Sequence, residues 1–135
     1  MRTIIDLSTG QQTVDPDWQP EPPTTADLLD LIKARRDTAI ASGTTVAGVP
    51  VHTDETSQTR IMGAAVAAML DPAYSVQWKT AAGSFVILSA AQVIGIATAI
   101  RAHVQACFDR EADLRAAVLA GASFDIEVGW PGEGE

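Results

Sequence analysis

The sequence predicts a mostly helical α+β domain, with a three-helix core and small β-hairpins between the helices. The 22 residues from 71 to 92 contain the end of one helix, a hairpin and the capped start of a long helix. The chain of 135 residues has the size of one ordinary domain and is long enough to bury a core without disulfides. Its hydrophobic fraction of 47% is rich in alanine, with only 5% aromatic residues, so we expect small, closely approaching helices.

The first helix is predicted over about residues 25–42. Thr24 is a candidate N-cap, and Asp27, three positions on, supplies the acid of a capping box. Apolar residues then recur at helical spacing. Ser42 and Gly43 are expected to end the helix.

A first hairpin is predicted over about residues 45–52. The segment TTVAGVPVHTD alternates about Gly48, which suits a tight turn. Pro50 has no N–H to donate to a ladder, so this hairpin is expected at an edge.

The second helix is predicted over about residues 56–70, capped by Thr53, Asp54 or Ser57. Its apolar positions form a narrow stripe, and Asp71-Pro72 ends it.

A second hairpin is predicted over about residues 74–88, with its turn at Ala82-Gly83. Tyr74, Val76 and Trp78 alternate with polar residues and therefore share one face of the first strand. Tyr74 and Trp78 either cover the helices or form a flat patch that binds a partner.

The longest helix is predicted over about residues 90–120. Ser89 and Gln92 make a capping box at its start, and Gly121 ends it. Eight of its residues repeat at spacings of four and three, the pattern of a heptad seam: Val93, Ala97, Ile100, Val104, Cys107, Glu111, Leu114 and Val118. The seam predicts either packing on the other two helices or self-association, with Glu111 specifying register or oligomeric state.

The two ends of the chain differ from this body, which we place at residues 24–131. Residues 1–23 contain two short β-prone runs and then a proline-rich linker, which together suggest a docking arm. Within this arm, Ile4, Ile5 and Trp18 are the candidate partner-binding residues. Residues 132–135 are predicted to be an acidic, disordered tail, and Trp130 before them is a candidate for pinning the chain end to the hairpin.

The charge distribution argues against nucleic-acid binding. The formal net charge is −8, and both ends are acidic while the middle is nearly neutral. Such ends repel a phosphate backbone, and the sequence has no lysine and arginine stripe to offset them. The sequence also lacks a long apolar run, so no membrane insertion is expected.

His103, Cys107 and Glu111 lie four residues apart on one predicted helix and invite comparison with a metal site. Successive positions of this kind rise by about 6 Å, so three of them do not converge on one tetrahedral ion. Cys107 falls on the core side of the seam, where a thiol packs as a small hydrophobic group. We therefore expect no metal, no cofactor and no enzymatic activity.

A resemblance to a known family indicates a function, which these residues alone do not indicate. The motifs that carry it are K-x-x-R-D in the first helix, V-x-G-V-P-V-x-T-D, S-Q-x-R-I, W-K-T-A-x-G-x-F-V-x-L and H-V-Q-A-C-F-D-x-E. Over about residues 28–131 the chain resembles the family catalogued as domain of unknown function 4376. Its members look like phage and prophage proteins encoded among tail-fibre and baseplate genes.

The resemblance implies a tail-associated role without enzymatic activity. It leads to the hypothesis of a structural or interaction protein of a tailed-bacteriophage tail, made in the host cytoplasm and carried in the virion. Its expected partner is a tail-fibre or baseplate protein, bound through residues 1–23, and a homo-oligomer, with a trimer favoured, is a further expectation. The alternative is a tail-fibre assembly chaperone that is absent from the mature virion.

Overall fold

A computed structural model describes residues 3–5, 12–14 and 22–132 of the chain, and it confirms the predicted α+β class. The elements in chain order are β1 (Thr3–Ile5), β2 (Gln12–Val14), α1 (Thr25–Ile40), β3 (Thr44–Val46), β4 (Val49–Val51), α2 (Glu55–Leu70), β5 (Ser75–Lys79), β6 (Phe85–Ser89) and α3 (Ala90–Ala120). The strands pair only with their neighbours in sequence, as antiparallel two-stranded hairpins within the described residues. None of the helices described is long and apolar enough to cross a membrane.

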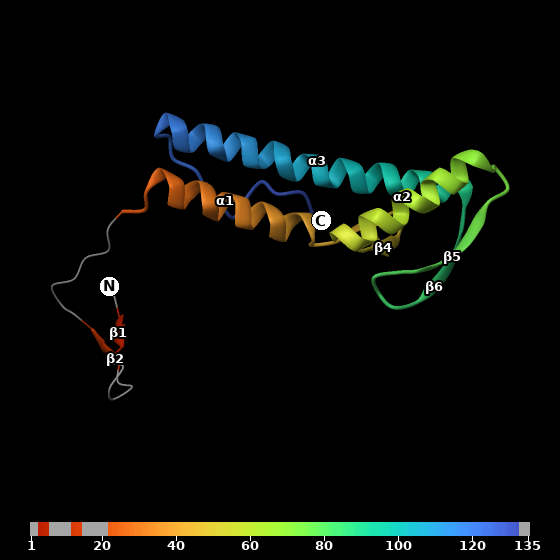
Figure 1. Cartoon of the computed structure of the whole chain (residues 1–135), viewed down its shortest axis with the longest axis horizontal. Helices are drawn as coiled ribbons and strands as arrows, with labels where there is room; N and C mark the ends of the chain where they lie inside the picture. Colours follow the sequence, from red (N-terminus) through yellow and green to blue (C-terminus); the bar gives the residue numbers. More distant parts are fainter. Residues whose placement is uncertain (1–2, 6–11, 15–21, 133–135) are drawn as a thin grey trace.

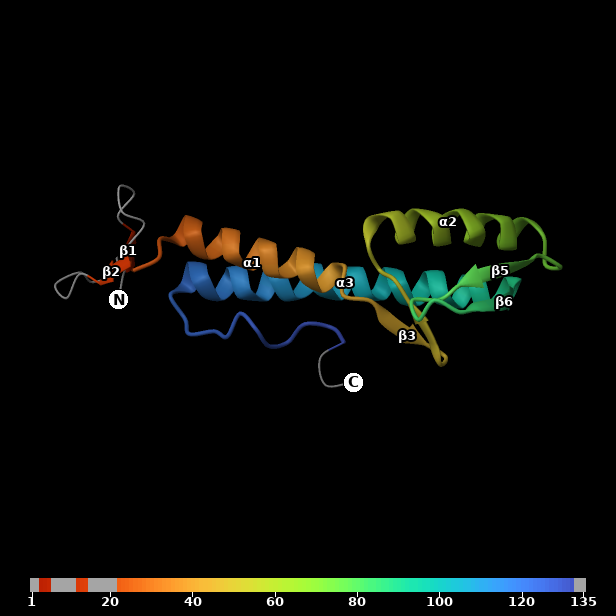
Figure 2. The ribbon, with the colours of Figure 1, turned by 90° about the horizontal axis from the view of Figure 1, so that it is seen from below.

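The helices are arranged as two short ones in tandem along one long one (Figures 1 and 2). Both α1 and α2 run antiparallel to α3, with α1 on its C-terminal half and α2 on its N-terminal half. The 31 residues of α3 span about 46 Å, and α1 and α2, of 16 residues each, span about 24 Å apiece. The two short helices therefore cover the whole length of the long one.

Because of this arrangement, the core divides into two hydrophobic clusters. The α2 cluster lies between α2, the hairpins and the start of α3, and its members are Val51, Ile61, Ala64, Ala65, Ala68, Leu88, Ala90, Val93, Ile96, Ala97 and Ile100. The α1 cluster lies between α1, the second half of α3 and the C-terminal segment, and its members are Ile32, Ala39, Cys107, Leu114 and Trp130. Alanine lines the α2–α3 contact, which lets these two backbones approach closely.

The caps of α1 and α3 are the predicted ones. The Thr24 hydroxyl accepts from the Asp27 N–H at 3.1 Å, and Asp27 accepts in return from the Thr24 N–H. Ser89 and Gln92 form the same reciprocal pair before α3, and Gly121 ends α3 with a left-handed φ of 67°. The first helix ends at Ile40, two residues earlier than predicted.

Asp54 is the N-cap residue of α2, so the cap is one of the three predicted candidates. Its carboxylate accepts from the Ser57 hydroxyl. Thr53 is fully buried and joins the two short helices, because its hydroxyl donates to the Ile40 carbonyl at 2.6 Å and accepts from the Gly43 N–H at 2.8 Å. These bonds hold the end of α1 beside the start of α2.

The two hairpins of the body are linked to each other. Ala47 and Gly48 form the β3–β4 turn with φ of 50° and 81°, the pattern of a type I′ turn. The second hairpin turns through a five-residue loop, 80–84, which contains the predicted turn residues Ala82 and Gly83. The Ala81 N–H of this loop donates to the Pro50 carbonyl of β4 at 2.9 Å. This bond holds the loop against the first hairpin.

The C-terminal segment, residues 122–132, folds back along the C-terminal half of α3 (Figure 2). Trp130 is 3% exposed and packs in the α1 cluster, so it holds the chain end against helices α1 and α3. The prediction that Trp130 holds the chain end against a hairpin was therefore wrong. Arg110 of α3 donates from Nε to the Val128 carbonyl at 2.9 Å, and Arg35 of α1 pairs with Glu127 at 3.2 Å. Polar contacts from both helices thus hold this segment over the core.

Candidate functional site

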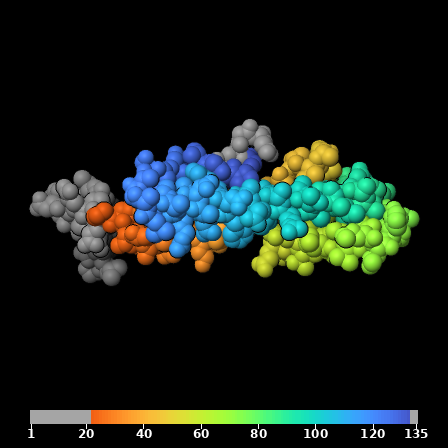
Figure 3. All heavy atoms as spheres, turned by 90° about the horizontal axis from the view of Figure 1, so that it is seen from above, coloured from red at the N-terminus to blue at the C-terminus, as the bar shows by residue number. Residues whose placement is uncertain are grey.

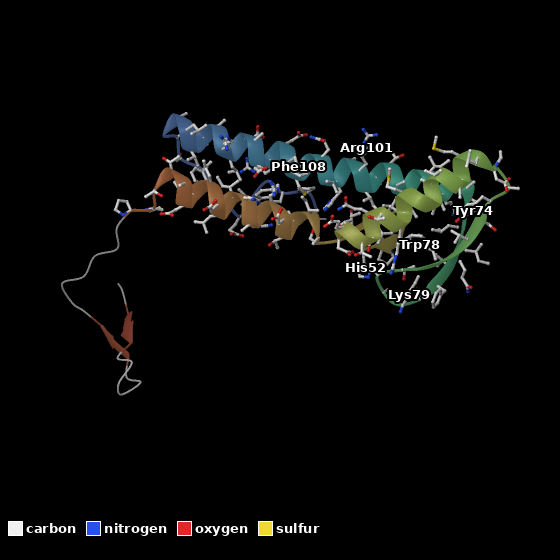
Figure 4. All side chains as sticks on the ribbon, viewed as in Figure 1. His52, Tyr74, Trp78, Lys79, Arg101 and Phe108 are labelled. Atoms are coloured by element: carbon white, nitrogen blue, oxygen red, sulfur yellow. The ribbon has the colours of Figure 1, made fainter. Side chains whose placement is uncertain are left out.

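The first of two candidate sites is a pocket of about 410 Å³ where both hairpins, the start of α2 and α3 meet. We call it the hairpin pocket. It is lined by Val51, His52, Ser57, Arg60, Trp78, Lys79, Thr80, Ala81, Gly83, Ile96 and Ile100. Figure 4 shows His52, Trp78 and Lys79 gathered at this end of the molecule. The bond between Ala81 and Pro50 brings the two hairpin walls together.

The hairpin pocket has an apolar floor and a cationic rim. Val51, Ile96 and Ile100 are buried core residues, whereas His52, Arg60 and Lys79 are exposed. The residues described include no ion-pair partner for Arg60 or Lys79.

Acidic residues adjoin the pocket at the start of α2. The hydrogen bond from Ser57 lowers the pKa of the Asp54 carboxyl, and nearby His52 adds a smaller effect in the same direction. Asp54 is therefore partly satisfied by neighbours on its own helix turn, and neither it nor Glu55 lines the pocket.

The second candidate site is an apolar groove between α2 and α3, formed by two adjoining depressions of about 310 and 190 Å³. We call it the α2–α3 groove. The two depressions share Met62, Ala97 and Arg101, so they form one continuous feature. Its other lining residues are Gln58, Ile61, Ala65, Met69, Ile94, Thr98, Ile100, Val104, Gln105 and Phe108. In the space-filling view α2 and α3 lie side by side along this face (Figure 3).

The α2–α3 groove exposes large apolar side chains around one cation. Met62, Met69, Ile94 and Phe108 are exposed, and Met69 reaches 74%. Arg101 lines both depressions and extends outward from α3 (Figure 4), and it has no ion-pair partner in the part of the chain that the structure describes. No acidic residue among those described lines the groove.

Tyr74 and Trp78 are both half-buried and pack against the α2 cluster. Together with Val76 they occupy the inward face of the second hairpin, as the alternation predicted. Trp78 also lines the hairpin pocket, whereas Tyr74 does not. The structure therefore places these two aromatic residues in the core's outer layer and assigns only Trp78 to a cavity.

The heptad seam of α3 faces the interior along its whole length. Val93, Ala97 and Ile100 belong to the α2 cluster, against which Val104 packs. Cys107 and Leu114 belong to the α1 cluster, against which Val118 packs. The seam residues thus pack within the chain on α2 and then on α1, which leaves no continuous seam exposed for a second copy.

Glu111, the polar member of the seam, is paired with α1. Arg36 Nη1 lies 2.9 Å from both carboxylate oxygens of Glu111, and the side chains are only 15% and 24% exposed. The Arg36 guanidinium also stacks over the Phe108 ring at 4.9 Å. Glu111 therefore sets the register between two helices of one chain.

His103 and Cys107 are both buried side chains. Buried His103 lies with Nε2 2.9 Å from the Ala39 carbonyl, and because a carbonyl only accepts, Nε2 carries the proton that it donates. This bond satisfies a carbonyl at the end of α1. Burial raises the pKa of the Cys107 thiol, which keeps it protonated. In the described parts of the chain no three His, Cys, Asp or Glu residues are grouped to hold a metal ion.

The remaining predicted residues belong to the N-terminal arm. Ile4 and Ile5 lie in β1, which pairs with β2 through Ile4 opposite Thr13 and Ile5 opposite Gln12. Trp18 and the acidic residues 133–135 lie outside the described residues. The role of this arm as a docking segment stays a prediction.

Residues 23–129 match the family described as Domain of unknown function (DUF4376). The chain belongs to this family. The DUF4376 match spans α1 through α3 together with most of the C-terminal segment, and thus both candidate sites. No curated protein and no solved structure matches the chain.

Sequence reasoning missed the residues that distinguish both sites. Arg60, Lys79 and Arg101 are isolated cations in the sequence, and neither they nor His52 form a motif with neighbouring residues. Met62 and Met69 lie in the second helix, where the sequence predicted only a narrow apolar stripe. The available signal was weak: Met62, Val66 and Met69 are more apolar residues than a narrow packing stripe needs.

Proposed function

We propose that this DUF4376 protein is a non-enzymatic interaction protein of a tailed-phage tail, carried in the virion beside a fibre or baseplate protein. The α2–α3 groove is the observation that supports binding best. Contiguous apolar surface of this kind marks protein–protein contacts, and methionine adapts well to a partner's shape. The family resemblance supports the placement in a phage tail.

The groove suits an amphipathic helix of the tail partner that carries an acidic residue. A helix laid between α2 and α3 would bury the exposed Met62, Met69 and Ile94. A carboxylate on that helix would pair with Arg101, which lines both halves of the groove. The lack of lining acids among the described residues makes the groove complementary to a negatively charged partner.

A second copy of the chain fits this groove less well. In a two-fold interface the residue at the centre faces its own copy, so Arg101 would face Arg101. Like charges placed together in a desolvated interface disfavour association. We therefore assign the groove to a different protein, and we propose residues 1–23 as a second attachment point on the same tail structure.

The first test is whether the chain is present in virions. Particles of the phage that encodes it would be separated from lysate on a density gradient, and the chain would be counted by peptide mass spectrometry against the major tail protein. We expect a fixed stoichiometry, with a multiple of three if it follows trimeric fibres. Absence from particles together with recovery on fibre protein from lysate would instead establish the assembly chaperone, the alternative function.

The second test concerns the groove. Arg101→Glu reverses the charge in the groove, and Met62→Lys places a charge on its apolar wall; both change exposed side chains, so both variants should fold. We expect each to reduce incorporation into particles, or capture by fibre protein, by about tenfold. Ile87→Lys is the matched control, because Ile87 is exposed on the outer face of β6 and does not line the groove. Equal loss in all three variants, or in none, would refute the role of the groove.

A further inference from the structure

The hairpin pocket differs from the groove in shape and in charge. It is a single depression of about 410 Å³, within the range of cavities that hold small molecules. Its walls come from four separate segments, which are residues 51–52, 57–60, 78–83 and 96–100. The Ala81–Pro50 bond fixes the loop 80–84 against β4. This bond holds two walls of the pocket beside each other.

The pocket concentrates positive charge on an acidic protein. Nine lysine and arginine residues face 17 acids in the whole chain, and yet two of the nine, Arg60 and Lys79, line this one cavity. Arg60 and Lys79 lack ion-pair partners among the described residues, in contrast to Arg36, which is paired with Glu111 and Asp37. Unpaired cations beside an apolar floor favour an anionic group as ligand.

The other walls indicate the rest of the ligand. Trp78 is partly exposed and lines the pocket together with the cations, and its indole N–H has no hydrogen-bond partner among the residues described. An aromatic wall favours a flat ring, which stacks with an offset on the indole. The Thr80 and Ser84 hydroxyls lie 3.0 Å apart and share one hydrogen bond, in which either of them can be the donor.

We infer that the hairpin pocket binds a small organic anion, whose carboxylate or phosphate meets Arg60 and Lys79 while its flat ring lies on Trp78. Arg60 supplies a fork of N–H donors that matches either oxyanion, and Lys79 adds a point charge. This site is independent of the α2–α3 groove, since the two share only Ile100, a buried residue of their common floor.

The test is a titration of the ¹⁵N-labelled full chain followed by amide chemical shifts. Phenyl phosphate and benzoate are the anionic ring probes, inorganic phosphate lacks the ring, and benzyl alcohol lacks the charge. We expect shifts around residues 52–60 and 78–83 with both ring anions, and affinities about tenfold above those of phosphate and benzyl alcohol. The stronger of the two ring anions identifies the charged group that the pocket prefers.

Variants then locate the site. Arg60→Gln and Lys79→Gln change exposed side chains and should each weaken binding of the better probe by about tenfold without altering the fold. Lys33→Gln, which changes an exposed cation of α1 outside both candidate sites, is the control and should bind as the unchanged chain does. Absence of shifts with both ring anions, unchanged binding in Arg60→Gln and Lys79→Gln, or an equal loss in Lys33→Gln would overturn the inference.

Discussion

Replacing Trp130 by alanine tests whether the C-terminal segment belongs to the core. The indole is 3% exposed and packs on Ile32, Ala39, Cys107 and Leu114. A buried tryptophan removes roughly 150–250 Å² from water, which at about 25 cal/mol per Å² corresponds to about 4–6 kcal/mol. Measured losses for such truncations are about 3–5 kcal/mol. We expect about 3 kcal/mol, because a terminal segment settles into the vacated space more readily than a helix does.

Urea unfolding followed by far-ultraviolet circular dichroism measures this loss. With a denaturant slope of about 1.5 kcal/mol per molar urea, the midpoint should fall by about 2 M. The matched control is Val128→Ala in the same segment, which truncates a side chain that is 50% exposed and should change stability by less than about 0.5 kcal/mol. A Trp130→Ala loss below about 1 kcal/mol would show that the segment does not cover the core.

Hydrogen exchange locates the same effect. Trp130 belongs to the α1 cluster, and the α2 cluster is a separate set of residues. The amides of α1 should therefore exchange faster in Trp130→Ala, with smaller changes in α2. Equal acceleration in both helices would mean that the two clusters unfold as one unit.

Three further predictions follow from individual contacts. Arg36→Ala, Glu111→Ala and the double variant should give a coupling free energy of about 1–2 kcal/mol in urea unfolding, because the pair is mostly buried, and a coupling near zero would contradict the register role. The Asp27 carboxylate accepts a hydrogen bond from the Thr24 N–H, which lowers the pKa of this carboxyl below its ordinary value of 3.8. The cap therefore stabilises the fold at pH values above 3.8, and this stabilisation is lost as the pH falls through the folded-state pKa. The melting temperatures of the unchanged chain and Asp27→Ala should therefore converge in acid, and a constant difference would refute the cap. The Cys107 thiol, whose pKa is raised by burial, should react with a disulfide reagent only on unfolding, and rapid labelling of the native chain would show that it is accessible.

The candidate sites were only partly predictable from the sequence. Trp78 was recognised because its position in an alternating strand is a local pattern. The hairpin pocket also needs His52, Arg60 and Lys79, which come from three segments and meet only because loop 80–84 bonds to Pro50. A contact between residues that lie far apart in the sequence leaves no pattern of spacing from which it could be predicted.

The sequence by itself determined the local features of this protein. Reciprocal caps at Thr24 and Ser89 join residues only three apart, so the starts of α1 and α3 are encoded where they occur. The tertiary structure decided how the seam of α3 is used. The apolar seam indicates that one face of α3 must be buried. Because the hydrophobic effect is not directional, the seam does not indicate which element covers that face. Here α1 and α2, each half as long as α3, share that face end to end, and Trp130 returns to cover the α1 half.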